Sequence, residues 1–133
     1  MSEVDKQLAA ALGRIPSGLF VVTCREGQRE TGLLASFVQQ CSFVPPLVSL
    51  AVKVGRAVLD WLEPGKQFTI NILDETQTDM IAHFGRGFGL DENPFEELEV
   101  ERSEEWGAVL RDCLAYLHVR VKERGRTSFT NLS

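Results

Sequence analysis

Two nearly continuous apolar runs constrain most strongly what this chain can fold into. Residues 18–25 read GLFVVTCR and residues 47–54 read LVSLAVKV. Such runs predict strands buried on both faces, because neither face carries enough polar side chains to meet water. Residues 31–38 follow the first run across a short polar turn, so these two segments predict a β-hairpin. The Pro45-Pro46 pair is expected to break strand pairing before the second run.

Three later segments predict further strands. Residues 67–73 (QFTINIL) and 98–101 (LEVE) are short runs rich in β-forming residues. Residues 115–122 alternate apolar and polar side chains, which is typical of a strand with one buried face. That face carries Ala115, Leu117, Val119 and Val121. His118 lies on the opposite, polar face and is expected to be solvated.

Short helices are predicted between the strands. The apolar spacing of residues 3–14 and 56–62 fits short helices, and Asp74 with Gln77 fits a capping box for a helix at 75–84. Strands and helices do not alternate regularly along the chain. This order favours an antiparallel β-barrel with helical elaborations over a doubly wound parallel sheet.

Length and charge exclude several classes of protein. The chain has 133 residues, 19 acidic and 14 basic, for a formal net charge of −5, which predicts one globular domain over residues 1–133. Without a basic cluster or a long apolar run, neither nucleic acid nor a membrane is an expected partner. No secretory leader opens the chain. Three widely spaced cysteines imply neither a disulfide nor zinc, so a cytoplasmic location is expected.

Local motifs for other chemistries are weak. HFGRGFG at 83–89 has the glycines of a phosphate-binding loop, but a helix precedes it where a dinucleotide loop needs a strand. Ser36, Cys41, His83 and His118 include the residue types of a nucleophilic triad, but none lies in a nucleophile elbow. The two histidines have no acidic or cysteine neighbours at ligand spacing, so no metal site is predicted.

The segment between residues 31 and 56 is more informative. It combines small side chains with two cations, namely Gly32, Ala35, Ser36, Ser42, Lys53 and Arg56. Small side chains let backbone N–H groups reach a ligand, hydroxyl groups bond a phosphate, and cations neutralise it. The pattern fits a flat, phosphorylated ligand. Hairpin packing and a solvated pair of cations would give the same pattern, and spacing alone does not separate the two interpretations.

Four stretches resemble the flavin reductase-like, FMN-binding split-barrel family. They are ALGRIPSGLFVVT (11–23), TGLLASFVQQCSFVPPLVSLAVKVGRAVLDWL (31–62), FTINIL (68–73) and HFGRGF (83–88). The similarity is greatest to the flavin reductase domains of flavodiiron proteins, in which a strand of this type is followed by a Pro-Pro pair. The resemblance implies an antiparallel split β-barrel and a homodimer that binds one FMN per subunit near the dimer interface.

The resemblance also implies which residues bind FMN. They are Leu34, Ala35, Ser36, Phe37, Cys41, Ser42, Lys53, Arg56, Asn71, His83 and Phe84. In the family, the first four positions follow the phosphoribityl chain. Backbone N–H groups at Cys41 and Ser42 approach the pyrimidine edge of the flavin, and the segment with Lys53 and Arg56 binds phosphate. Structural alternatives exist: a small core residue at Cys41, a strand-pairing residue at Asn71 and a helix cap at His83.

The implied reaction needs no catalytic acid or base. A reduced pyridine nucleotide stacks on the isoalloxazine and passes hydride to its N5, while the protein aligns the two rings. His83 is the one candidate for a catalytic contribution, because its position matches a helix end beside the flavin. The resemblance therefore implies an NAD(P)H-dependent flavin reductase that delivers electrons to free flavin or to a protein acceptor.

One departure from the family pattern supports a different function. The family continues past the alternating strand into a turn with Gly-Asp-His and a further strand, whereas this chain reads KERGRTSFTNLS (122–133). Its C-terminal strands therefore look truncated. This favours, as an alternative, a non-enzymatic FMN-binding electron carrier that has lost the pyridine-nucleotide site; a third reading is a barrel kept only for dimerisation. The strand at 115–122 is left with an open edge, for which a partner subunit is the expected cover.

Overall fold

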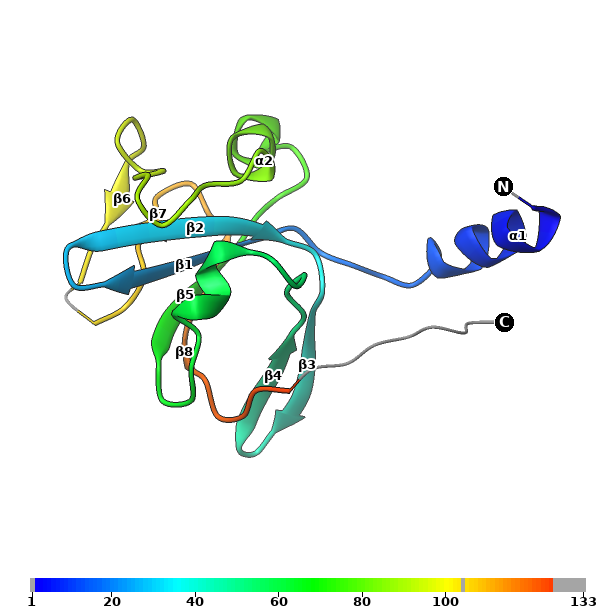
Figure 1. Ribbon diagram of the computed structural model, residues 1–133, viewed down its shortest axis with the longest axis horizontal. Helices are drawn as coiled ribbons and strands as arrows, with labels where there is room; N and C mark the ends of the chain where they lie inside the picture. The colour runs from blue at the N-terminus through cyan, green and yellow to red at the C-terminus, as the bar shows by residue number, and fades with distance from the viewer. Residues whose placement is uncertain (1, 104, 126–133) are drawn as a thin grey trace.

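The structure is a computed structural model that describes residues 2–103 and 105–125. It is mainly β, with antiparallel strands and short helices, as the sequence predicts (Figure 1). The strands are β1 (Phe20–Glu26), β2 (Arg29–Ala35), β3 (Val38–Phe43), β4 (Pro46–Leu50), β5 (Gln67–Ile72), β6 (Val100–Glu101), β7 (Val109–Leu110) and β8 (Ala115–Arg120). The helices are α1 (Glu3–Leu12), the 3-10 helix η1 (Ala57–Asp60) and α2 (Thr78–Gly85).

The central sheet has the strand order β2-β1-β5-β8, and every neighbouring pair is antiparallel. Two separate hairpins, β3–β4 and β6–β7, complete the β-structure. Among the described residues no strand pairs with the outer side of β8, so the open edge expected from the sequence is present and the barrel does not close. The expectation that strands are missing after β8 concerns residues 126–133, which lie outside the described residues.

Both faces of the central sheet are buried. On one face Val22 and Ile70 pack with Trp61 beside η1, and on the other Val21 packs with Phe84 of α2. Figure 1 shows α2 and β6–β7 above the sheet, with η1 and β3–β4 below it. Consecutive residues of a strand point to opposite faces, so the continuous apolar run of β1 supplies both cores. The prediction of a strand at 18–25 buried on both faces is confirmed.

The prediction for residues 47–54 is wrong in part. Strand β4 ends at Leu50, and in this single chain Val48 is 37% and Val54 is 63% exposed. The predicted strand at 31–38 also ends early, at Ala35, and the chain resumes as β3, which pairs with β4 across the two prolines. A proline is tolerated in a turn or as the first residue of a strand, because no backbone N–H is needed there for strand pairing. The pair therefore closes a hairpin instead of breaking one.

The predicted helices are present but shorter. Helix α1 begins at Glu3 behind a capping box between Ser2 and Asp5, whereas η1 has only four residues. The side chain of Gln77 accepts from the backbone N–H of Asp74 at 2.8 Å, which is half of the predicted capping box. Since the Asp74 carboxylate accepts from Thr76 instead of closing the box, α2 begins at Thr78.

Candidate functional site

The residues at the β2–β3 junction divide between the core and the surface. Ala35 is buried in one core and Leu34 packs against the other, whereas Ser36 is half-buried and the Phe37 side chain is 67% exposed. The Ser36 carbonyl accepts from the backbone N–H of Gly18 at 3.3 Å, which fixes the junction where the two strands separate. A ligand can therefore reach Ser36 and Phe37 from solvent.

Two cations lie in the turn that follows β4. Lys53 and Arg56 are joined by a backbone hydrogen bond of 3.2 Å, and both side chains are exposed. Neither forms a salt bridge within the described residues, although the chain carries a net charge of −5. Cations that remain unpaired on an acidic protein are available to an anionic ligand.

The loop after α2 approaches the same turn. The Nη1 atom of Arg56 lies 3.4 Å from the position that a Cβ would take at Gly87, and Leu34 lies 3.6 Å from the corresponding position at Gly85. The loop therefore lies within van der Waals reach of Arg56 and Leu34, and Gly87 permits its turn because its φ of 82° favours glycine. In this loop the Arg86 guanidinium lies 4.3 Å from the centroid of the Phe88 ring. This cation was not among the predicted site residues, although it lies within the HFGRGF stretch.

His83 and Phe84 differ in accessibility. Phe84 is 1% exposed and packs so closely on β2 that a Cβ at Gly32 would lie 2.8 Å from its ring, so Phe84 is a core residue. His83 is half-buried, and its Nε2 lies 2.7 Å from the carbonyl of Pro94. A carbonyl only accepts, so Nε2 carries a proton and Nδ1 is the nitrogen left for other contacts. The ring also lies against Phe88, with centroids 5.1 Å apart.

Cys41 is the extra residue of a β-bulge. The pairing register shifts between Gln40 and Ser42, so Cys41 has no partner on β4. Such a residue leaves its backbone groups outside the regular ladder. Ligand binding by backbone N–H groups near Cys41 and Ser42 stays a prediction. The Cys41 side chain is exposed, so the alternative of a small core residue is excluded.

Asn71 is fully buried and its amide is used by the protein itself. Its Nδ2 donates to the carbonyls of Val21 (3.1 Å) and Ala108 (3.3 Å), and its Oδ1 accepts from the backbone N–H of Leu110 at 2.9 Å. Among the described residues no buried side-chain nitrogen or oxygen lacks a partner. In this structure Asn71 does not reach a surface ligand, and its contacts match the strand-pairing alternative.

A second cluster, absent from the sequence prediction, lies on β8. His118 is exposed as predicted, but its ring stacks on Trp106 with centroids 4.6 Å apart, and its Nδ1 lies 3.0 Å from Oγ1 of Thr69. Thr69 donates its only hydroxyl proton to the carbonyl of Gly107 at 2.9 Å. The hydroxyl must then accept from His118, which places a proton on Nδ1. No local sequence pattern predicts these contacts, because they join residues far apart in the sequence.

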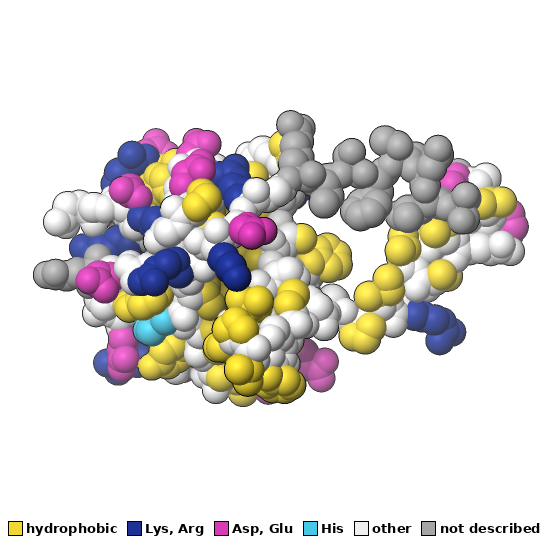
Figure 2. Space-filling model, turned by 90° about the horizontal axis from the view of Figure 1, so that it is seen from below, with side chains coloured by type: hydrophobic (Ala, Val, Ile, Leu, Met, Phe, Trp, Pro, Cys, Tyr) yellow, Lys and Arg dark blue, Asp and Glu magenta, His cyan; other side chains and the backbone are white. Residues whose placement is uncertain are grey.

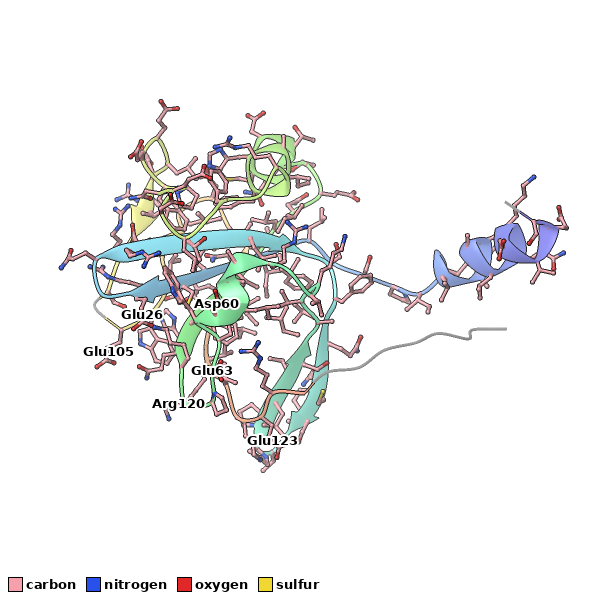
Figure 3. The ribbon with its side chains drawn as sticks, in the orientation of Figure 1. Glu26, Asp60, Glu63, Glu105, Arg120 and Glu123 are labelled. Atoms are coloured by element: carbon pink, nitrogen blue, oxygen red, sulfur yellow. The ribbon has the colours of Figure 1, made fainter. Side chains whose placement is uncertain are left out.

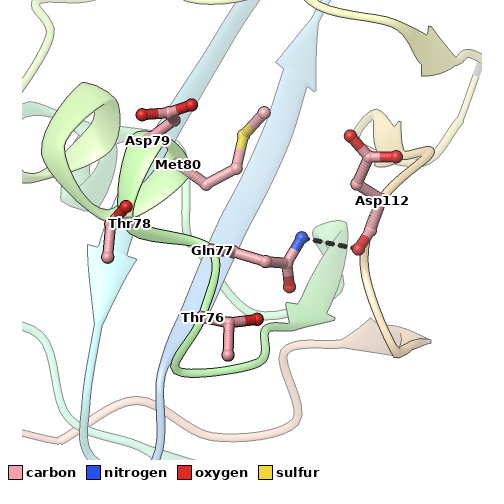
Figure 4. A pocket seen from close by; sticks show the side chains of 6 residues that line it. All are labelled: Thr76, Gln77, Thr78, Asp79, Met80 and Asp112. Carbon is pink, nitrogen blue, oxygen red and sulfur yellow. Dashed lines mark hydrogen bonds between the residues drawn. The ribbon is translucent and has the colours of Figure 1, made fainter.

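The carboxylates labelled in Figure 3 lie on the η1 side of the sheet, away from α2. Two of them are ion-paired: Glu26 with Lys66, and Glu63 with Arg124 at 2.9 Å. The pocket in Figure 4, with a volume of about 210 Å³, opens at the start of α2. It is lined by Thr76, Gln77, Thr78, Asp79, Met80 and Asp112, none of which belongs to the predicted site. Of the predicted residues, Phe37, Cys41, Lys53 and Arg56 lie exposed on the surface of this single chain, whereas Ala35, Asn71 and Phe84 are buried.

The three cysteines are all free. Burial raises the pKa of the Cys24 thiol to about 11 and also raises the pKa of Cys113. Both are therefore protonated at neutral pH and poor nucleophiles. Within residues 2–103 and 105–125, no group of three His, Cys, Asp or Glu side chains is placed to hold a metal ion. None of the described helices is long and apolar enough to cross a membrane.

Comparison with known proteins decides the family. Residues 12–130 match the flavin reductase like domain. The chain belongs to this family. Diflavin flavoprotein A 1 of Synechocystis sp. is 33% identical over 125 residues, which are 93% of this chain and 22% of that protein. The flavin reductase like chain described here thus spans about a fifth of the length of this relative.

Solved flavin reductases share the fold. The NADH:FAD oxidoreductase SgcE6 of Streptomyces globisporus superimposes with a TM-score of 0.81 at 21% identity, covering 93% of this chain and 74% of that one. Flavin reductase HpaC, complexed with NADP+, gives a TM-score of 0.71 at 20% identity and covers 92% and 76% of the two chains. These structures confirm the split-barrel class. Family membership makes flavin reduction the general chemistry of this domain.

Proposed function

We propose that this chain, as one unit over residues 1–133, binds FMN and acts as an NAD(P)H-dependent flavin reductase. It would pass electrons to free flavin or to a protein acceptor. The observation that carries the proposal is the approach of the loop 85–89 to Arg56, which forms no salt bridge with the residues described, beside the end of β2. Family membership supplies the general chemistry.

The residues present fit FMN. Lys53 and Arg56 would neutralise its phosphate, and Ser36 would donate a hydroxyl hydrogen bond near them. Backbone N–H groups at the bulge of Cys41 would face the pyrimidine edge. FMN, when bound, supplies hydride acceptance at its ring system. The chain's own part is to hold the ring, keep one face open for the nicotinamide and exclude water with Phe37.

A homodimer follows from the same proposal. In one chain the site is an open surface, whereas small-molecule sites usually bury most of the ligand. Phe37 and the apolar side chains of β4 are exposed, and β8 has an open edge. A second subunit would cover these groups and enclose the flavin. The three free cysteines fit a reducing, cytoplasmic setting.

The alternative function is an FMN-binding electron carrier without its own pyridine-nucleotide site. The observation in its favour is that residues 121–133 contain neither Asp nor His. SgcE6 is named an NADH:FAD oxidoreductase and HpaC is complexed with NADP+, so either nucleotide is a candidate here. Reduction by NADH or NADPH therefore separates the two functions.

Binding of FMN tests the phosphate role of Arg56. Arg56→Ala is expected to weaken FMN by about tenfold to a hundredfold and riboflavin hardly at all, because a charge-assisted hydrogen bond contributes about 1.5–3 kcal/mol and riboflavin has no phosphate. Quenching of flavin fluorescence measures both affinities. Arg120→Ala is the matched control, since that arginine is exposed on β8 and lies outside the site. Equal weakening of FMN and riboflavin would contradict the assignment.

Anaerobic reduction tests turnover. NADH or NADPH is expected to bleach bound FMN slowly, because residues 121–133 offer no Asp-His pair to hold the nicotinamide. A nicotinamide misplaced by about 1 Å already costs on the order of a hundredfold in rate. His83→Ala is expected to slow the reaction further if Nδ1 of that imidazole faces the flavin. Stopped-flow absorbance measures the rate, with dithionite as the control for a reducible flavin. FMN that dithionite reduces and neither nucleotide does would establish the electron-carrier alternative.

A further inference from the structure

Helix α1 carries an apolar stripe without cover. Val4, Leu8 and Leu12 follow one another at helical spacing and Ile15 extends the stripe, yet no residue of α1 is buried. Val4 is 65% and Ile15 is 61% exposed. Figure 1 shows α1 held away from the rest of the chain. A helix of ten residues is marginal in water by itself, so α1 needs a surface to pack against.

The β3–β4 hairpin is a second apolar surface without cover. Phe43 is 81%, Val44 is 90% and Val48 is 37% exposed. Figure 2, seen from the hairpin side of Figure 1, shows hydrophobic side chains gathered at this end of the molecule and others along the side of α1 that faces it. Large exposed apolar patches mark interaction sites. The same chain thus presents a stripe and a patch of matching chemistry.

The chain exposes more area than a compact monomer of its mass. The chain exposes 9327 Å², whereas a compact monomer of 14.8 kDa exposes about 7,000 Å². Part of the excess belongs to α1, which buries none of its residues. Large obligate interfaces bury roughly 1,000–2,500 Å² on each partner. Helix α1 and the β3–β4 hairpin are the described apolar surfaces that such an interface would remove from solvent.

We propose that α1 of each chain packs its apolar stripe on the β3–β4 hairpin of a second copy, so that the homodimer exchanges its N-terminal helices. This rests on the dimer in the proposed function and names the surfaces that meet. Two such contacts, related by a two-fold axis, close the assembly without leaving a free stripe or patch.

The N-terminal arm, residues 2–17 with α1, leaves the rest of the chain next to the candidate site. The backbone N–H of Gly18 donates to the Ser36 carbonyl at 3.3 Å, so the arm starts beside Ser36 and the exposed Phe37. All residues from Gly13 to Ser17 are exposed and lead away from the body. An exchanged arm therefore brings the subunit boundary to the edge of the surface on which FMN is proposed to bind.

A charge on the stripe tests the contact. Leu8→Glu is expected to weaken dimerisation by about a hundredfold, because each dimer would lose two buried leucine side chains. Ala10→Glu places the same charge on the opposite face of α1 and is expected to leave the dimer unchanged. Sedimentation equilibrium without added flavin measures both. Equal dimer affinity for the two variants, or a monomeric parent protein, would overturn the proposal.

A mixing experiment tests exchange between chains. Leu8→Glu keeps an intact hairpin, and Phe43→Glu keeps an intact α1. Neither alone can form the contact, but a mixed dimer restores it once if the contact joins two chains. Hydrogen exchange of α1 in an isotopically labelled Phe43→Glu chain is expected to slow about tenfold on mixing.

Two results would refute exchange. In the first, α1 is protected in the parent protein but its protection does not recover in the mixture, which would mean that α1 folds onto its own hairpin. In the second, α1 is not protected even in the parent protein. Because no flavin is present, these results do not depend on FMN binding. A dimer with protected α1 that fails to bind FMN would refute only the proposed function.

Discussion

Replacing Gly107 with alanine is expected to lower the free energy of unfolding by about 3 kcal/mol or more. An added Cβ would overlap the backbone carbonyl of Thr23 and lie 2.6 Å from its Oγ1. Thr23 belongs to β1, which is paired on both sides, so its backbone cannot move aside. Any retreat of Gly107 would also break the 2.9 Å hydrogen bond that its carbonyl accepts from Thr69.

Urea unfolding at a fixed protein concentration, followed by the fluorescence of Trp61 and Trp106, measures this change. Gly125→Ala is the matched control, because nothing lies within 4 Å of a Cβ at Gly125. It is expected to change the free energy of unfolding by less than about 0.5 kcal/mol. A Gly107→Ala protein as stable as its parent would show that the segment 106–108 does not lie against β1 as described.

Asn71→Leu is expected to cost about 2–4 kcal/mol of folding free energy. The substitution removes the Asn71 acceptor from the backbone N–H of Leu110 and the Asn71 donor from the carbonyl of Val21, and each buried group without a partner costs about 1–3 kcal/mol. The Ala108 carbonyl also loses this donor but keeps its 2.6 Å hydrogen bond from the Thr23 hydroxyl. Since Asn71 is fully buried, FMN affinity of the fraction that remains folded is expected to stay within about threefold of the parent value.

Gln67→Leu is the control for this second variant. It makes the same exchange of an amide for leucine on the same strand, at a half-buried residue whose side chain forms none of the hydrogen bonds found among the described residues. Chemical unfolding and FMN titration of both variants separate the roles of Asn71. A stable Asn71→Leu protein with greatly weakened FMN binding would restore Asn71 as a direct ligand of the flavin.

Strand positions were predictable wherever one local pattern decided them. The strands at 18–25 and 67–73 and the helix containing Phe84 follow from apolar runs and spacing, because burial selects for those patterns directly. Strand β3 was missed because its residues are mostly exposed in one chain and carry no buried face. The Pro45-Pro46 pair misled because a proline at a hairpin turn and one that breaks a strand look the same in sequence.

The candidate site was predictable only as a set of residues. The sequence indicates small residues and the cations Lys53 and Arg56, but it does not show that Gly87 meets Arg56 or that Phe84 is a core residue. Both contacts join residues more than 30 positions apart, Arg56 with Gly87 and Gly32 with Phe84, for which local spacing contains no signal. Arg86 was overlooked for the same reason, since only the fold brings its loop to the turn after β4.

The sequence by itself determined the class of fold and, through the resemblance, the family. Apolar patterning and a long series of matched stretches can both be recognised from the order of the residues alone. The tertiary structure alone decided which of the small and polar residues are buried. It placed Asn71 and Thr69 inside the protein, where a polar group is stable only if its hydrogen bonds are complete, and it left Phe37 and the stripe on α1 outside, where apolar side chains require a partner.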